Sequence, residues 1–181
     1  FIVFTFVIVV VGHTQQLIEY KTTENPWAES LGNHRAVLQI DKPSNAVLLN
    51  LPWRRHDQNP ESKKFVIIHE NSGDTIQNIY RIQVNNEFCK IAFGPITRPG
   101  IYHFYYLPFQ PQEGHGCYHK DYLKKEPEPE MAWVVANKLG KPNKVKKTAR
   151  ANCVRLESRT DFDSFYPMEV IAFESEKDQY R

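Results

Sequence analysis

The sequence lacks a strong excess of charge of either sign. Its 181 residues carry 23 Lys and Arg against 21 Asp and Glu, which gives a formal net charge of +2. Such a balance produces no strong long-range field, and we expect neither a nucleic acid nor an anionic membrane surface as partner. The one basic run, residues 138–147, has no Arg or aromatic side chain between its lysines, which favours a solvated loop over a phosphate-binding patch.

Cysteine is also scarce. Cys89, Cys117 and Cys153 are odd in number, so at least one thiol cannot form a disulfide within this sequence. Three cysteines in this length do not make a disulfide framework, and nothing marks any of them as an activated nucleophile, although a Cys–His pair stays open. There is no N-x-Ser/Thr glycosylation acceptor, so nothing indicates a eukaryotic surface protein.

Several catalytic motifs are missing as well. The sequence contains no G-x-S-x-G, no Gly-rich phosphate loop and no H-E-x-x-H, so it gives no sign of a serine-hydrolase elbow, a nucleotide loop or a zinc-protease helix. The densest group of potential metal ligands recurs every second residue, and in a strand such neighbours lie about 6.6 Å apart. A loop could still bring them together, but we favour a polar loop and predict no metal and no cofactor. These ligands are His115, Cys117, His119 and Asp121.

Two groups of carboxylates could in principle flank a glycosidic bond. Residues 126–130 and 161–163 hold them, and both groups have the pattern of helix starts or caps. We therefore favour capping over catalysis. A self-contained hydrolase that uses Asp161 or Asp163 with a Glu is the least favoured hypothesis.

No apolar run is long enough to cross a membrane, which takes roughly 20 residues in a helix. Residues 1–11 are apolar apart from Thr5 and suit the core of a secretory signal peptide cut after Gly12. A buried strand is the alternative. Because there is no initiator Met and no basic segment before the run, we expect a fragment that starts inside its signal, with residues 13–26 as a linker.

From Gly32 onward, apolar residues recur with a period of two, and turn residues interrupt them about every ten residues. This pattern is typical of an antiparallel β-sandwich rather than of alternating strands and helices. We expect residues 27–173 to form one mostly β domain, an antiparallel β-sandwich with one covering α-helix. The expected strands are 34–40, 46–53, 64–70, a hairpin over 79–95 that turns at Asn85 and Asn86, 101–107, 151–159 and 168–173.

The alternation also predicts which side chains share a face of each strand. One arm of the hairpin places Tyr80, Ile82 and Val84 together, and the other places Cys89, Ile91 and Phe93 together. In the strand at 151–159, Cys153 is expected on one side, with Val154 and Leu156 on the other.

The segment 100–109 is unusually aromatic. As a strand it places bulky side chains on both faces, so it is either covered on both sides within the core or forms a platform on which a sugar stacks. We favour core packing, and we interpret His103 as a hydrogen-bonded structural residue. The candidate sugar-binding rings, should the platform exist, are Trp53, Tyr102, Tyr105 and Tyr118.

One helix is expected after residue 128, and we expect it to cover the aromatic strand. Met131, Val134, Val135 and then Lys138 or Leu139 recur at three- and four-residue spacing, which predicts one apolar face. Gly140 is expected to end the helix.

Three stretches carry a resemblance to a known family. They are "WAESLGNHRAVLQIDKPSNAVLLNLPWRRHDQNPESKKFVI" (27–67), "GIYHFYYLPF" (100–109) and "RTDFDSFYPMEVIA" (159–172). Together they resemble the N-terminal β-sandwich domain of bacterial glycoside hydrolase family 123 and its relatives.

The resemblance implies a location for the chemistry. Enzymes of that family are retaining β-N-acetylgalactosaminidases, in which the substrate's 2-acetamido group attacks the anomeric carbon while an Asp orients it and a neighbouring Glu acts as acid and base. That pair lies on a (β/α) barrel after the sandwich, so no catalytic residue can be assigned here, and residues 174–181 would begin the connection to the barrel.

The resemblance leads us to expect a secreted, periplasmic or cell-surface protein. Its sandwich would pack against the downstream barrel and be non-catalytic itself. The alternative is a stand-alone carbohydrate-binding module that contacts glycans directly.

Overall fold

The computed structural model describes residues 18–53, 59–106, 108–110, 121–141 and 148–160. Several sequence predictions lie outside these residues. They are the signal peptide at 1–12, Tyr118, the ligand cluster before Asp121, the carboxylates at 161–163, the strand at 168–173 and the connection at 174–181.

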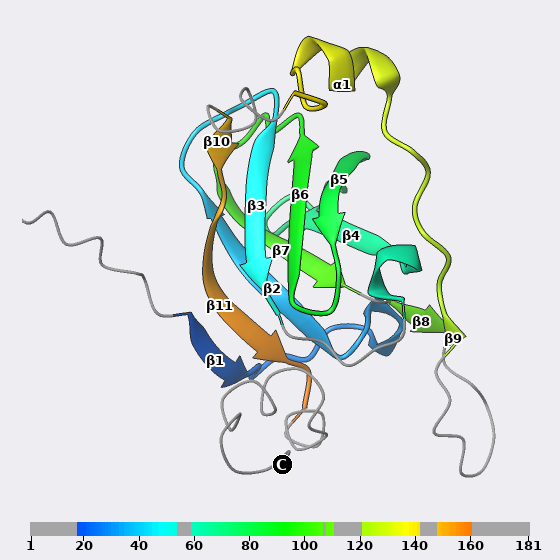
Figure 1. Cartoon of the computed structure of the whole chain (residues 1–181). Helices are drawn as coiled ribbons and strands as arrows, with labels where there is room; N and C mark the ends of the chain where they lie inside the picture. The colour runs from blue at the N-terminus through cyan, green and yellow to red at the C-terminus, as the bar shows by residue number, and fades with distance from the viewer. Residues whose placement is uncertain (1–17, 54–58, 107, 111–120, 142–147, 161–181) are drawn as a thin grey trace, which may run out of the picture.

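Two β-sheets pack face to face, and the four-stranded sheet faces the viewer in Figure 1. The five-stranded sheet has the order β1 (Glu19–Thr22), β11 (Asn152–Ser158), β2 (His34–Ile40), β7 (Gly100–Tyr106) and β4 (Phe65–His69). The four-stranded sheet has the order β10 (Ala149–Arg150), β3 (Val47–Pro52), β6 (Phe88–Gly94) and β5 (Asn78–Val84). The smaller elements are η1 (Glu29–Leu31), η2 (Pro60–Ser62), β8 (Phe109–Gln110), β9 (Asp121–Tyr122) and α1 (Met131–Ala136).

The predicted β-sandwich is confirmed, and most of its pairings are antiparallel. Two pairings between described strands are parallel, β1 with β11 and β10 with β3. Strand β1 lies within residues 13–26, which the sequence predicts to be a linker, so four of those residues belong to the five-stranded sheet.

The core lies between the two sheets and follows the period of two. Ala36, Leu38 and Ile40 of β2 are buried there, as the alternation predicts. Cys89, Ile91 and Phe93 of β6 meet them from the other sheet. The aromatic strand β7 contributes Tyr102, Phe104 and Tyr106, so this face of the strand is core.

Two β-bulges change the predicted faces. The register shifts between Arg81 and Gln83, so Val84 packs in the central core while Tyr80 and Ile82 lie on the other face of the sheet. A second shift lies between Cys153 and Arg155 in β11, and Cys153 therefore packs against the same core as Leu156 rather than opposite it.

Helix α1 forms where predicted but packs differently. It covers the outer face of the four-stranded sheet, where Val134 and Leu139 contact Ala46 and Ala92, and it does not cover β7. Met131 and Val135 are 68% and 69% exposed. The predicted apolar face was wrong because the helix ends at Ala136. Leu139 contacts the sheet from the turn that follows the helix and not from a continuous helical face.

The residue that ends α1 also differs from the prediction. The sequence predicts Gly140 as the residue that ends the helix, whereas the left-handed residue just after α1 is Lys138, with φ of 56°. The backbone N–H of Leu139 then donates to the Val134 carbonyl at 3.2 Å, which fixes the turn.

Candidate functional site

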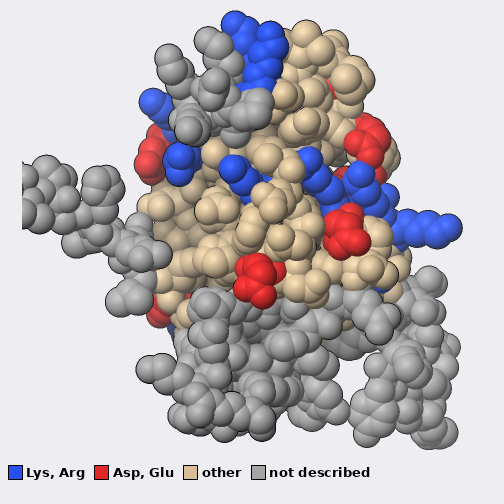
Figure 2. Space-filling view, viewed as in Figure 1, with Lys and Arg blue, Asp and Glu red and all other residues tan. Residues whose placement is uncertain are grey.

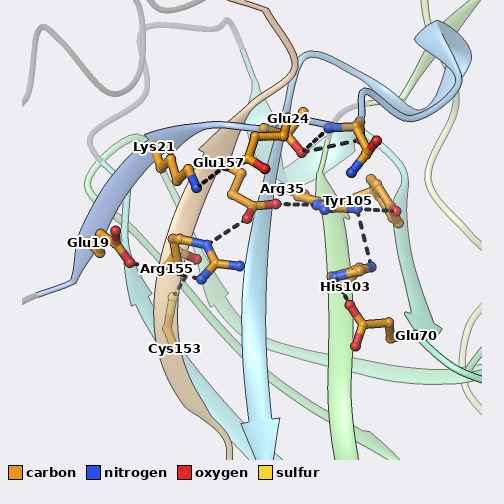
Figure 3. Close-up of polar contacts among 12 residues, drawn as sticks. Glu19, Lys21, Glu24, Arg35, Glu70, His103, Tyr105, Cys153, Arg155 and Glu157 are labelled. Carbon is orange, nitrogen blue, oxygen red and sulfur yellow. Dashed lines mark hydrogen bonds and ion pairs between the residues drawn. The ribbon is translucent and has the colours of Figure 1, made fainter.

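A polar cluster lies on the face of the five-stranded sheet that points away from the core (Figure 3). Arg35 of β2 is paired in register with Tyr105 of β7 on one side and with Glu157 of β11 on the other. Because side chains alternate along a strand, these residues point outward while Ala36, Phe104 and Leu156 point into the core. We call Trp27, Arg35, His103, Tyr105, Arg155 and Glu157 the outer polar cluster.

Arg35 is the centre of the outer polar cluster. Its Nε donates to Glu157 Oε2 at 2.7 Å, and its Nη1 donates to the Tyr105 hydroxyl at 3.1 Å. The guanidinium carbon also lies 4.5 Å from the centroid of the Trp27 ring, which is a cation–π distance. One side chain thus joins three strands to the segment that precedes β2.

Glu157 is held by arginines on both of its oxygens. Arg155 Nε donates to Oε1 at 2.6 Å while Arg35 occupies Oε2. Burial acts to raise the pKa of Glu157, but the hydrogen bonds and charges of the two arginines outweigh it and lower the pKa. A carboxylate kept ionised in this way is unsuited to act as a general acid.

His103 lies beside Arg35 and is 8% exposed. Its Nδ1 is 3.3 Å from Arg35 Nη1, and its Nε2 is 3.4 Å from Glu70 Oε1. Burial, followed by the positive charge of Arg35, lowers the pKa of His103 below its usual range. These contacts agree with its interpretation as a hydrogen-bonded structural residue.

The structure buries the three candidate sugar-binding rings that it describes. Trp53 is 2% exposed, its ring packs against Phe65, and its Nε1 donates to the Asn85 carbonyl at 2.7 Å. Tyr102 is 2% exposed and donates its hydroxyl to the Arg98 carbonyl at 2.7 Å.

Tyr105 is buried within the outer polar cluster, with the Trp27 ring edge-on to it at 5.7 Å. Burial of this degree leaves no broad ring face of the three for a sugar. The fourth candidate, Tyr118, lies outside the described residues.

Glu126 has a structural role that the sequence pattern does not predict. Arg81 contacts both of its carboxylate oxygens, and Oε2 also accepts the backbone N–H of Phe65 at 2.8 Å. Glu126 is therefore part of a mostly buried ion pair rather than a helix cap. Sequence alone gave no signal for a pair that joins β5 to the segment after β9.

The rest of that carboxylate run lies at the surface. Glu128 pairs with Lys125, and both side chains are exposed. Glu130 precedes α1 as its N-cap but makes no side-chain capping bond, and its backbone N–H donates to Asn78 Oδ1 at 2.9 Å.

Of the two described cysteines, Cys153 is a free thiol. Cys89 is fully buried in the core, and burial raises the pKa of Cys153 to about 12. Cys153 therefore lacks the lowered pKa that a nucleophilic cysteine needs. Cys117 lies outside the described residues.

Across the described ranges, no three His, Cys, Asp or Glu side chains come together as a metal site would require. Within the same ranges, no helix combines the length and apolar character needed to cross a membrane. On the surface in Figure 2, acidic and basic side chains are scattered among uncharged ones over the face that carries β3, β5 and β6.

The two packed sheets define a β-sandwich domain that carries the outer polar cluster on the face of one sheet. Residues 25–159 match the family model of the glycoside hydrolase 123 N-terminal domain. Because the match covers more than half of the chain, the chain belongs to this family. No curated protein and no solved structure matches it.

Proposed function

We propose that this domain is the non-catalytic N-terminal β-sandwich of a secreted glycoside hydrolase. Hydrolysis takes place on a (β/α) barrel that follows it in the same protein, and the substrates are glycans that contain N-acetylhexosamine. The family match over residues 25–159 supports the N-terminal position. The apolar run at residues 1–11 supports export to the periplasm, the cell surface or the medium.

The state of the buried carboxylates carries the proposal. In the part of the chain that the structure describes, Glu157 and Glu126 are the best shielded from water, with side chains 5% and 8% exposed, and each forms an ion pair with arginine. A glycosidase needs one carboxyl group with a raised pKa to protonate the leaving group. The arginine partners of Glu157 lower its pKa instead, and Glu126 is held by Arg81 and by the backbone N–H of Phe65, which supports a structural role for both.

The work of such a domain is mechanical. The sandwich provides a rigid body that packs against the barrel and shapes one wall of its substrate cleft. The alternative, a stand-alone carbohydrate-binding module, loses support from the burial of Trp53, Tyr102 and Tyr105.

The decisive experiment extends the coding sequence beyond the codon for Arg181 and expresses the whole product. We expect the long protein to hydrolyse 4-nitrophenyl N-acetyl-β-D-galactosaminide and the 181-residue chain to be inactive. Replacing the Asp of the downstream Asp–Glu pair with Asn should abolish turnover, whereas Glu157→Gln in the same protein should retain it.

Two results would overturn the proposal. Turnover by the 181-residue chain would place catalysis within it. A stop codon directly after Arg181 would leave the domain to act alone, and binding of the purified chain to immobilised N-acetylgalactosamine would then establish the binding-module alternative.

A further inference from the structure

The contacts of His103 select one protonation state. A guanidinium carries only hydrogen-bond donors, so the Nδ1 atom that faces Arg35 Nη1 at 3.3 Å has to accept. The ring proton of neutral His103 then lies on Nε2, which faces the Glu70 carboxylate at 3.4 Å (Figure 3). Both ring nitrogens are satisfied only while Nδ1 carries no proton.

Protonation of His103 removes this fit. A proton on Nδ1 points at an N–H group of Arg35, so the hydrogen bond between them is lost and two positive charges become neighbours. Like charges at this distance disfavour the charged form of the titrating group. Separation of Arg35 from the ring would relieve this conflict.

We propose that His103 is an acid-sensitive latch that controls how firmly the segment around Trp27 is held on the sheet. Arg35 is the connecting residue, because its guanidinium supports the Trp27 ring at 4.5 Å. The Trp27 carbonyl accepts from Arg159 Nε at 2.9 Å. Displacement of Arg35 would therefore loosen the contacts of Trp27 and, through the Trp27 carbonyl, those of Arg159. These two residues lie at the start and the end of the family-matched range.

The charged and titratable groups around His103 come from every neighbouring element. Strand β2 contributes Arg35, β7 contributes Tyr105, the turn after β4 contributes Glu70, and β11 contributes Arg155 and Glu157. The residues paired with His103 in register, Val37 and Ile68, are uncharged.

The balance of these groups sets the direction of the response. Burial and the two arginines lower the pKa of His103, and the two carboxylates raise it by less. Since the folded pKa lies below the usual 6.5, protonation opposes the folded arrangement. The loss of stability begins as the pH falls below about 6.5 and is complete below the folded pKa.

The latch is tested by hydrogen exchange of the full chain at pH 7.5 and pH 5.0, corrected for the intrinsic pH dependence of exchange. We expect the amides of residues 27–33 to lose protection several-fold at pH 5.0. In His103→Asn the side-chain oxygen can accept from Arg35 in place of Nδ1 but does not titrate, so residues 27–33 should keep their protection at pH 5.0. His69→Asn changes a buried histidine outside the cluster, so residues 27–33 should lose protection at pH 5.0 as they do in the wild type.

A ring-nitrogen NMR titration of His103 in the unmodified chain gives an independent test that does not rely on a variant folding. We expect the Nε2–H tautomer at pH 7.5, with the protonated ring forming below pH 6.5. The latch is refuted if Nδ1 carries the proton at pH 7.5. It is equally refuted if the wild type and His103→Asn lose the same protection on acidification.

Neither measurement involves glycoside turnover. Failure of the latch is therefore distinguishable from failure of the proposed function.

Discussion

Arg81 and Glu126, 45 residues apart in the sequence, form a two-point ion pair beside the core. Nε lies 2.9 Å from Oε1, and Nη2 lies 2.7 Å from Oε2. The same guanidinium lies 3.7 Å from the centroid of the Phe65 ring and donates to the carbonyls of Glu61 and Lys63. One side chain therefore connects β5, β4, η2 and the segment that leads to α1.

Breaking this pair should destabilise the domain strongly. Glu126→Ala leaves the Arg81 guanidinium mostly buried without its carboxylate, and loss of one member of a buried pair costs about 3–5 kcal/mol. Urea unfolding of the purified chain measures the change in the free energy of unfolding.

Glu128→Ala is the matched control for Glu126→Ala, because Glu128 pairs with Lys125 at the surface. An exposed pair contributes about 0–1 kcal/mol. If the two substitutions change the free energy of unfolding equally, the Arg81–Glu126 pair contributes no more to stability than a surface ion pair.

Gly94 is required by a close approach of the chain. A Cβ atom at this position would lie 2.7 Å from the Asn45 carbonyl oxygen, and the backbone φ is +153°. We expect Gly94→Ala to destabilise the domain by about 1–3 kcal/mol, because the backbone has to shift and the strained conformation persists.

Gly140→Ala is the control for Gly94→Ala, since nothing lies within 4 Å of a Cβ there. We expect its thermal unfolding midpoint to match that of the wild type closely. If Gly94→Ala has the same thermal unfolding midpoint as Gly140→Ala, the close approach of Gly94 to Asn45 is contradicted.

The two sides of the α1 region should respond differently to truncation. Leu139 is 3% exposed and packs with Val134 on the sheet, so Leu139→Ala should cost about 2–5 kcal/mol. Met131 is 68% exposed, and Met131→Ala should change stability by no more than about 0.5 kcal/mol. Chemical denaturation of both variants decides between this arrangement and the helical stripe that the sequence predicts.

Glu157 should make the domain sensitive to acid. Its arginine partners lower its pKa below the ordinary value of 4.5 despite its burial. The ion pair therefore contributes fully above about pH 4.5 and is lost as the pH falls through the lower folded pKa. Unfolding curves at pH 7, 5, 4 and 3 should show that the free energy of unfolding falls more steeply for the wild type than for Glu157→Gln.

Glu24→Gln separates this effect from general acid denaturation. Glu24 pairs with Lys21 at the surface, where the interaction is screened and weak. The free energy of unfolding of Glu24→Gln should fall with decreasing pH as steeply as that of the wild type. If it falls as little as that of Glu157→Gln, the acid sensitivity does not come from Glu157 in particular.

The sandwich was predictable because local alternation and turn residues carry most of its information. Strand β2 buries Ala36, Leu38 and Ile40 as the period of two requires, and the hairpin turns at Asn85, whose side-chain oxygen accepts the N–H of Phe88 at 2.9 Å. These features depend on neighbours in the sequence.

The remaining features depend on contacts between distant segments. A bulge near Cys153 shifts a strand by one residue without a composition signal. The Arg35–Glu157 pair joins residues 122 positions apart, and periodicity shows only that each points outward. The sequence could therefore indicate the scaffold, whereas the outer polar cluster required the register between strands.

The parallel pairing of β1 with β11 has a mechanical consequence. Glu19 lies opposite Arg155 and Thr22 opposite Ser158, so the first and the last described strands of this sheet are adjacent and point the same way. A pull on the chain before Glu19 against a pull after Ser158 slides these strands past each other, and it loads their hydrogen bonds together rather than one by one. The pairing thus acts as a shear clamp, which resists tension along the polypeptide better than an unzipping edge would.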